Sequence, residues 1–427
     1  MQVNLSGRLS DRFFDPNTAG GVSQRQVAIS VSAAALTEEQ APLNLCLVLD
    51  HSGSMGGKPL DTVKRAACAL VDQLSYRDRL SVVSFDHKAK VILENQTVDR
   101  PESIKERIQA LRSGGGTSID EGMKLALQEL SKVKSGVVSQ AFILTDGENE
   151  HGNNDRCLQF AQLAAEYGIT LHTLGFGDEW NQNVLEKIAD AGNGAMSHIQ
   201  TPEQAIAEFS TLLRRVQSIT LTNAFLELEL PEYVRLAELK PIAQVSPDAI
   251  ELPLQIHPSS ALVTVRLGDL MTTERVIVIN LYIGNQIFDQ LKTSKANQVN
   301  ILTAQVRYDL PAQAQEALLT SPIQIEATLD QDFKPAIDPE VQMHIFALAK
   351  YRQTQLAETK LHQGDRLGAA TMLQSAAKTA LQMGDERAAT VLHTNATRLQ
   401  AGNDLNEAER KQTRMVSKTV LQVSPPS

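Results

Sequence analysis

Hydrophobic residues change their spacing twice along the chain, and these changes divide it into three parts. From about residue 43 to residue 217, short apolar runs alternate with segments in which apolar residues recur every three or four positions. The first pattern is typical of buried strands and the second of amphipathic helices. Alternating strands and helices predict a mostly parallel sheet covered by helices on both faces. We therefore predict a doubly wound α/β domain over residues 41–217.

Two strands of this domain stand out because they are almost entirely apolar. Residues 43–49 contain one polar residue, Asn44, and residues 141–145 end in Thr145 after four apolar positions. Such runs predict strands that are buried on both faces. Further strands are predicted at 79–85, 89–93, 169–174 and 195–199, and helices at 60–74, 101–111, 118–133, 155–167, 184–191 and 203–217.

After residue 218 apolar and polar residues alternate, and helical spacing is lost up to about residue 337. Leu226, Leu228 and Leu230 share one strand face, and Glu227 and Glu229 share the other. Many short alternating runs separated by turns predict a β-sandwich over residues 218–337. The runs are 219–230, 250–256, 262–267, 275–283, 300–308 and 323–329. Residues 1–40 contain one more such run, 26–31, and this N-terminal segment is predicted to join the sandwich, so that the α/β domain is an insertion.

Helical spacing returns in residues 338–420. Two segments resemble each other, Gly364–Thr371 and Gly384–Thr390, and each places a glycine and an aspartate before an alanine-rich helix. Glycine ends a helix and aspartate caps the next one. The pattern predicts a helical domain, either a plain bundle or a helical repeat. Residues 421–427 are predicted to be a disordered tail.

Composition narrows the class of protein. The 427 residues include 40 Lys and Arg against 50 Asp and Glu, a net charge of −10. This acidic balance argues against nucleic acid and anionic lipid as partners. No apolar stretch is long enough to insert in a membrane, and the start lacks the features of a secretory signal. Cys46, Cys68 and Cys157 lie far apart in apolar segments, as expected for reduced thiols. We expect a cytoplasmic protein.

Oxygen-bearing side chains follow the two buried strands and a glycine-rich loop between them. Asp50, Ser52 and Ser54 come directly after the first strand, Thr117 follows three glycines, and Asp146 follows the second strand. In a parallel sheet the carboxyl ends of the strands lie at one edge, which is where ligands bind. Carboxylates and hydroxyls without sulfur or imidazole suit Mg²⁺ or Mn²⁺, with Ca²⁺ as an alternative.

This constellation resembles the metal-ion-dependent adhesion site of von Willebrand factor type A domains, and the resemblance covers about residues 41–217. It implies that Ser52, Ser54 and Thr117 are direct metal ligands and that Asp50 and Asp146 bind directly or through water. It also implies that a partner protein supplies a Glu or Asp as a further ligand. The implied function is metal-dependent protein binding rather than catalysis, and the resemblance makes helix 203–217 the candidate for a shift on binding.

Other interpretations stay open at this point. The two aspartates can be ordinary loop or capping carboxylates, and the glycines can form a phosphate cradle, although no Gly-Lys-Ser/Thr follows them. A metal-assisted hydrolase would use the same ion and needs a general base, for which His51 and Glu148 are the candidates. A third alternative is a scaffold in which the sandwich and the helical part bind partners and the metal is incidental.

Overall fold

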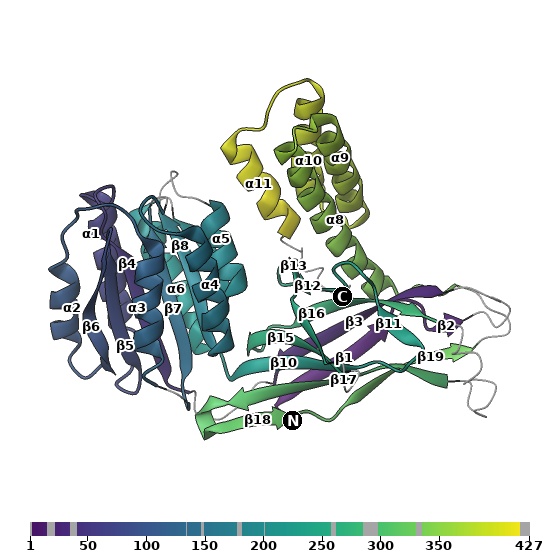
Figure 1. The fold of residues 1–427 in the computed structure, drawn as a ribbon, viewed down its shortest axis with the longest axis horizontal. Coiled ribbons are helices and arrows are strands. Elements are labelled where there is room, and N and C mark those ends of the chain that lie inside the picture. The colour runs from purple at the N-terminus through teal and green to yellow at the C-terminus, as the bar shows by residue number, and fades with distance from the viewer. Residues whose placement is uncertain are drawn as a thin grey trace.

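The computed structural model has three parts, an α/β domain, a pair of β-sheets and a group of C-terminal helices (Figure 1). It describes residues 2–14, 22–34, 41–133, 135–146, 149–176, 182–199, 201–257, 262–284, 298–329 and 335–418. In Figure 1 the C-terminal helices lie above the paired sheets, beside the α/β domain. The predicted tail, residues 421–427, and the candidate base Glu148 lie outside the described residues.

The α/β domain is built on one six-stranded sheet. Only the edge pair β5–β6 is antiparallel, and the other neighbours run parallel. The predicted mostly parallel sheet is therefore confirmed. In spatial order its strands are β6 (Ala89–Thr97), β5 (Arg79–Phe85), β4 (Leu43–Asp50), β7 (Val138–Thr145), β8 (Ile169–Phe176) and β9 (Asn193–Ile199).

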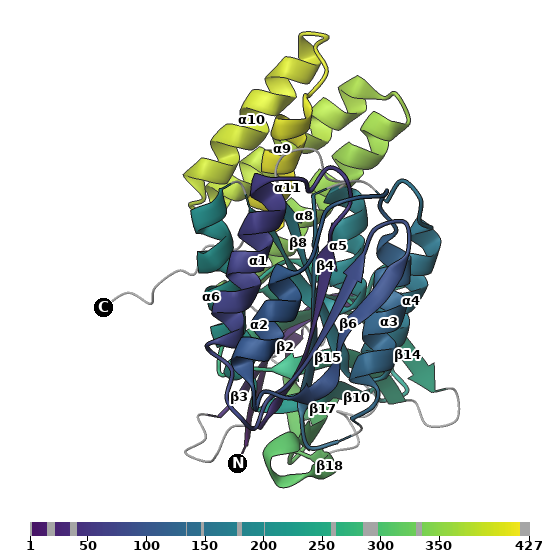
Figure 2. The same ribbon diagram turned by 90° about the vertical axis from the view of Figure 1, so that its left-hand side faces the viewer.

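Strand β4 explains why its sequence is apolar at nearly every position. Leu45, Leu47 and Leu49 face one hydrophobic core, whereas Cys46 and Val48 face another on the opposite side of the sheet. Helices cover both faces, as Figure 2 shows. The first core is closed by α1 (Lys58–Val71), α2 (Pro101–Gln109) and α6 (Pro202–Gln217), and the second by α3 (Ile119–Leu130), α4 (Asn154–Glu166) and α5 (Gln182–Ala191).

Two further sheets pack around one shared core of mainly Val, Leu and Ile. The first contains β1 (Val3–Leu9), β3 (Ser23–Ala33), β16 (Arg275–Ile283), β12 (Ile242–Ser246), β13 (Ile250–Glu251) and β11 (Val234–Leu236). The second contains β14 (Leu254–His257), β15 (Leu262–Leu270), β10 (Leu221–Glu229), β17 (Gln298–Leu310), β19 (Ile323–Leu329), β2 (Phe13–Phe14) and β18 (Gln315–Leu319), with the short 3-10 helix η1 (Pro311–Gln313) before β18.

The order of these strands places the start of the chain next to its later half. β3 pairs with β16, with Val27 opposite Ile279, and the chain returns from the α/β domain into β10. The predicted strand at 250–256 is wrong in one respect, because it is two short strands that belong to different sheets. Pro253 lies between them and has no N–H to donate to a sheet. The short strands β11, β12 and β18 carried too little alternation to be predicted.

Four described helices form the C-terminal part, α8 (Pro339–His362), α9 (Arg366–Gln382), α10 (Glu386–Gln400) and α11 (Glu407–Lys418). Gly364 and Gly384 have φ near +79° and +75°, a conformation that favours glycine and ends α8 and α9. Asp365 and Asp385 then cap α9 and α10 by accepting backbone N–H groups. The resulting core is rich in alanine, so the helices pack closely.

Specific contacts join the three parts. Asp269 of β15 accepts hydrogen bonds at 2.7 Å from Gln140 of β7 and from Thr170 of β8. At another junction, Lys418 of α11 forms ion pairs with Glu186 and Asp190 of α5. Among the described residues, no helix is long and apolar enough to cross a membrane.

Candidate functional site

The candidate site lies at the edge of the sheet where β4 and β7 end. These two strands are parallel neighbours with Leu49 opposite Leu144, so the loops that begin at Asp50 and Asp146 leave the sheet side by side. Asp50 is fully buried, and Asp146 is half-buried. We call Asp50, Ser52, Ser54, Thr117 and Asp146 the Asp50 cluster.

Hydrogen bonds link four of these five residues in a row. The Ser52 backbone N–H donates to Asp50 Oδ1 at 2.8 Å. Ser54 Oγ donates to Asp146 Oδ1 at 2.8 Å, and it lies 3.0 Å from Ser52 Oγ. Since the Ser54 proton points to Asp146, Ser52 is the donor between the two serines. The loop after β4 and the loop after β7 thus share one polar surface.

The glycine-rich loop that leads to Thr117 contacts the loop after β4. Gly53 N–H donates to the Gly115 carbonyl at 3.0 Å, and Gly114 N–H donates to the His51 carbonyl at 2.8 Å. Gly115 has φ near +80°, and a Cβ there would meet Asp86 at 2.6 Å, so this approach requires glycine. Thr117 is buried at the end of this loop, just before α3.

Asp50 is held by partners that keep its carboxylate in one orientation. Thr145, the last residue of β7, donates from Oγ1 to Asp50 Oδ2 at 2.6 Å. Burial raises the pKa of Asp50 to about 6; the hydrogen bonds from Thr145 and Ser52 oppose this rise, and the negative charge of Asp146 adds to it. A cation beside the two carboxylates would favour their ionised forms.

The donor set fits a small hard cation. Ligands on adjacent positions of an octahedral Mg²⁺ site lie about 3.0 Å apart, because each is about 2.1 Å from the ion. The Ser52–Ser54 and Ser54–Asp146 oxygen pairs are 3.0 and 2.8 Å apart. In the part of the chain that the structure describes, no three His, Cys, Asp or Glu side chains are placed to hold a metal ion. A metal at the Asp50 cluster would therefore depend on its hydroxyls.

Several residues around the cluster have roles that the sequence did not indicate. Asn149 is buried, and its Oδ1 accepts the N–H of Ile119 at the start of α3. The His151 N–H donates to the Thr117 carbonyl at 2.9 Å. His51 is half-buried, and its Nδ1 donates to the Arg112 carbonyl at 3.0 Å. The one sequence signal for Thr145 was its position directly before Asp146.

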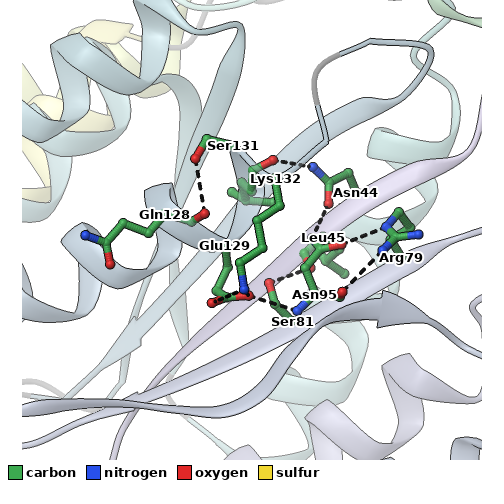
Figure 3. Close-up of polar contacts among 10 residues, drawn as sticks. Asn44, Leu45, Arg79, Ser81, Asn95, Gln128, Glu129, Ser131 and Lys132 are labelled. Carbon is green, nitrogen blue, oxygen red and sulfur yellow. Dashed lines mark hydrogen bonds and ion pairs between the residues drawn. The ribbon is translucent and has the colours of Figure 1, made fainter.

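A second polar group, the Glu129 cluster, lies at the opposite edge of the sheet, where β4 and β5 begin. Figure 3 shows its polar contacts. It consists of Asn44, Arg79, Asn95, Glu129 and Lys132. Lys132 Nζ lies 2.7 Å from Glu129 Oε2, and the Asn95 N–H donates to the same oxygen at 2.9 Å. Asn44 accepts from the Asn95 amide at 2.6 Å, and Arg79 donates to Asn95 Oδ1 at 2.7 Å. The cations of this cluster, Lys132 and Arg79, are side chains of the protein itself.

Comparison with known proteins identifies two regions. The von Willebrand factor type A domain family matches residues 44–211, and the family described as "Sll0103-like, C-terminal alpha-helical domain" matches residues 339–423. "Uncharacterized protein sll0103" of Synechocystis sp. is 53% identical over 429 residues, which cover 100% of this chain and 99% of that protein.

Other relatives are similar over less than half of this chain. Human inter-alpha-trypsin inhibitor heavy chain H4 is 30% identical over 200 residues, or 44% of this chain and 21% of that protein. "Uncharacterized protein YfbK" of Escherichia coli is 28% identical over 186 residues, or 42% of this chain and 32% of that protein. The chain thus aligns with only a fifth to a third of the length of these two proteins.

Solved structures share the whole arrangement. A von Willebrand factor type A protein from Catenulispora acidiphila superposes with a TM-score of 0.81 at 18% identity, covering 98% of this chain and 97% of that one. The ArnB paralog VWA2 from Sulfolobus acidocaldarius gives 0.59 at 14% identity, covering 98% of both chains. These likenesses concern the fold. They confirm the predicted fold class, and the family match confirms the predicted domain type, whereas the metal site stays a prediction.

Proposed function

The chain belongs to the Sll0103-like family of proteins with a von Willebrand factor type A domain, and from that premise we propose that it binds a partner protein through a divalent cation at the Asp50 cluster. Domains of this type often serve in protein–protein interaction or adhesion. The proposed partner presents an Asp or Glu side chain. The proposed cation is Mg²⁺ or Mn²⁺, with Ca²⁺ as the alternative.

The spacing of the oxygens carries this proposal. Ser52, Ser54 and Asp146 present hydrogen-bonded oxygens 2.8–3.0 Å apart, close enough for all three to share one divalent cation. Ser52, Ser54 and Thr117 are the proposed direct ligands. Both oxygens of Asp50 already accept hydrogen bonds from the protein, which favours contact through water for this residue.

Neutral ligands suit a binding role. When bound, the cation supplies an electrophilic position that takes a carboxylate oxygen from the partner, and hydroxyl ligands leave most of its charge available. The chain holds its hydroxyls in place through the Gly53–Gly115 and Ser54–Asp146 hydrogen bonds. We also propose that the protein is not an enzyme, since the Asp50 cluster consists of hydroxyls and carboxylates and includes no imidazole or amine that could serve as a general base.

A pull-down tests the binding proposal. The immobilised chain is incubated with extract of its native cells in Mg²⁺, and bound proteins are eluted with EDTA and identified. We expect EDTA to release partner proteins from the wild-type chain. We expect Thr117→Ala to capture none of these proteins. Ser113→Ala is the matched control, because Ser113 is an exposed hydroxyl on the same loop outside the cluster. Capture that persists in EDTA, or that Thr117→Ala leaves unchanged, would contradict the proposal.

The hydrolase alternative needs its own assay. Wild type and Asp50→Ala are screened against phosphate-ester substrates with Mg²⁺ and with Mn²⁺. We expect no turnover above the blank for either protein. If wild type shows metal-dependent turnover and Asp50→Ala abolishes it, the protein has a catalytic role and the proposal is wrong.

A further inference from the structure

A cavity of about 520 Å³ lies where the three parts of the molecule meet. The α/β domain contributes residues of α4 and α5, the paired sheets contribute β10, β14 and β15, and the C-terminal helices contribute Tyr351 of α8. We call it the junction cavity. Its volume is within the range of about 300–1,000 Å³ that is typical of small-molecule sites, which often form between domains.

Much of the cavity wall is apolar. Leu158 of α4, Phe225 of β10, Leu254 of β14 and Leu252 just before it line the cavity, and each is half-buried. Tyr351 closes another side and is 8% exposed. These side chains offer a surface for the body of an organic molecule.

The wall contains three carboxylates: Glu166 of α4 is exposed to solvent, and the other two are paired with cations from the C-terminal helices. Glu251 accepts two hydrogen bonds from Arg352 of α8, at 2.8 and 3.0 Å. Asp190 forms an ion pair with Lys418 of α11 at 3.1 Å. Their negative charge is therefore largely balanced within the protein.

Arg266 of β15 is in the opposite situation. Its guanidinium stacks over Phe225, 5.0 Å from the ring centre, and donates to Asn223 Oδ1 at 3.3 Å. Its Nε is buried without a hydrogen-bond partner among the described residues, and none of their carboxylates lies within ion-pair distance. Burial lowers the pKa of Arg266, and the more distant charges of Asp269 and Glu166 partly offset this. A cation that is partly desolvated and lacks a close anion favours an anionic ligand.

We propose that the junction cavity binds a small organic anion, with its negatively charged group at Arg266 and its apolar body against Phe225, Leu252 and Leu254. Lys187 of α5, an exposed cation in the same wall, adds to the attraction. A bound anion would touch all three parts of the chain and stabilise their arrangement.

A neighbouring cavity without a cation in its described lining serves as a comparison. This second cavity, of about 370 Å³, also lies between the α/β domain and the paired sheets. Its described lining includes Asp309, Glu316 and Glu166, the last shared with the junction cavity, and no Lys or Arg. The same binding chemistry is therefore not expected there.

Two dyes that differ in one charged group test the proposal. 8-Anilinonaphthalene-1-sulfonate carries a sulfonate, and N-phenyl-1-naphthylamine has the same ring system without it. By fluorescence titration we expect wild type to bind the sulfonate dye at one site per chain and more tightly than the neutral dye. Arg266→Met should weaken the sulfonate dye about tenfold or more, since it removes a charge-assisted contact, and leave the neutral dye unchanged.

Two further variants complete the experiment. Arg235→Met is the matched control, because Arg235 also stacks on an aromatic ring, Tyr282, but lies outside the cavity. Leu254→Trp fills the cavity from its edge strand and should block both dyes, which keeps the test valid should Arg266→Met fail to fold. EDTA should change nothing, because the metal proposal concerns another site. Unsaturable binding of the sulfonate dye, or equal affinity in Arg266→Met, would overturn the proposal.

Discussion

The Asp50 cluster and the Glu129 cluster occupy opposite edges of the same sheet, and each contains a buried carboxylate. At the Glu129 cluster the carboxylate lies 2.7 Å from the ammonium of Lys132 and accepts the Asn95 N–H. At the Asp50 cluster the carboxylate accepts from Ser52 and Thr145, and its charged neighbour is a second carboxylate, Asp146. In the Glu129 cluster a cation of the chain balances the negative charge, whereas the Asp50 cluster brings together two carboxylates and hydroxyl oxygens.

This difference separates a structural role from a binding role. A buried polar network that satisfies all its members specifies a packing arrangement. A group of oxygens with like charges is better suited to an added cation. We therefore expect changes in the Glu129 cluster to alter stability without altering metal affinity, and changes in the Asp50 cluster to do the reverse.

The largest stability effect is expected from Asn44→Ala. Asn44 is fully buried, donates to the Leu130 carbonyl and to Ser139 Oγ at 3.0 Å each, and accepts from Asn95. Removing its amide leaves three partners unsatisfied, which should lower the free energy of unfolding by about 3 kcal/mol. Urea denaturation measures the loss, and Mg²⁺ titration of the folded variant should give the wild-type affinity. A changed Mg²⁺ affinity would show that the two clusters are not independent.

A third buried polar group, His172 of β8, extends the comparison to acid pH. Its Nδ1 accepts the Ala195 N–H and its Nε2 donates to Gln140, so the neutral ring is satisfied. Burial lowers the pKa of His172 to about 3. Because the unfolded chain takes up the proton below pH 6.5, this stability is present above pH 6.5 and is lost as the pH falls toward 3.

The expected size of this loss is about 2 kcal/mol between pH 8 and pH 5. Urea denaturation of wild type and His172→Gln at both pH values isolates the contribution of His172. The variant should lose less stability than wild type on acidification. Equal losses in the two proteins would contradict a buried neutral ring.

Sequence predicted the Asp50 cluster better than it predicted the Glu129 cluster, and the reason is geometric. The apolar strands β4 and β7 mark where two loops begin, and parallel pairing brings those loops together. The Glu129 cluster draws single polar residues from α3, β4, β5 and β6, and no spacing pattern joins them. The contact of Thr145 with Asp50 likewise depends on the register of two strands. The junction cavity depends on how three parts meet, which local pattern does not encode.

Removing a single hydroxyl of the Asp50 cluster should have a smaller effect, and this effect should be on Mg²⁺ affinity rather than on stability. Ser54 is exposed, and its Oγ donates to Asp146. Ser54→Ala removes one proposed ligand and should weaken Mg²⁺ about tenfold, or about 1.4 kcal/mol, with a change in unfolding free energy below about 0.5 kcal/mol. Ser113→Ala on the neighbouring loop should change neither quantity. Wild-type Mg²⁺ affinity in Ser54→Ala would remove this serine from the ligand set.

The smallest effect is expected from Lys132→Met. The Lys132 side chain is 47% exposed, so solvent screens its ion pair with Glu129. The variant should lose about 0.5–1 kcal/mol of stability, and the loss should shrink at high salt. Urea denaturation at low and high NaCl measures both values. A loss near that of Asn44→Ala would mean that the ammonium, rather than the amide network, holds this cluster together.

Calorimetric titration of Mg²⁺ into wild type and Asp50→Asn tests the central claim most directly. The variant keeps the shape of the side chain and removes its charge, so the circular dichroism spectrum in EDTA should match wild type and show that the variant is folded. We predict one Mg²⁺ per wild-type chain and at least a hundredfold weaker binding in Asp50→Asn. No heat of binding in wild type, or equal affinity in the variant, would contradict a cation held by the Asp50 cluster.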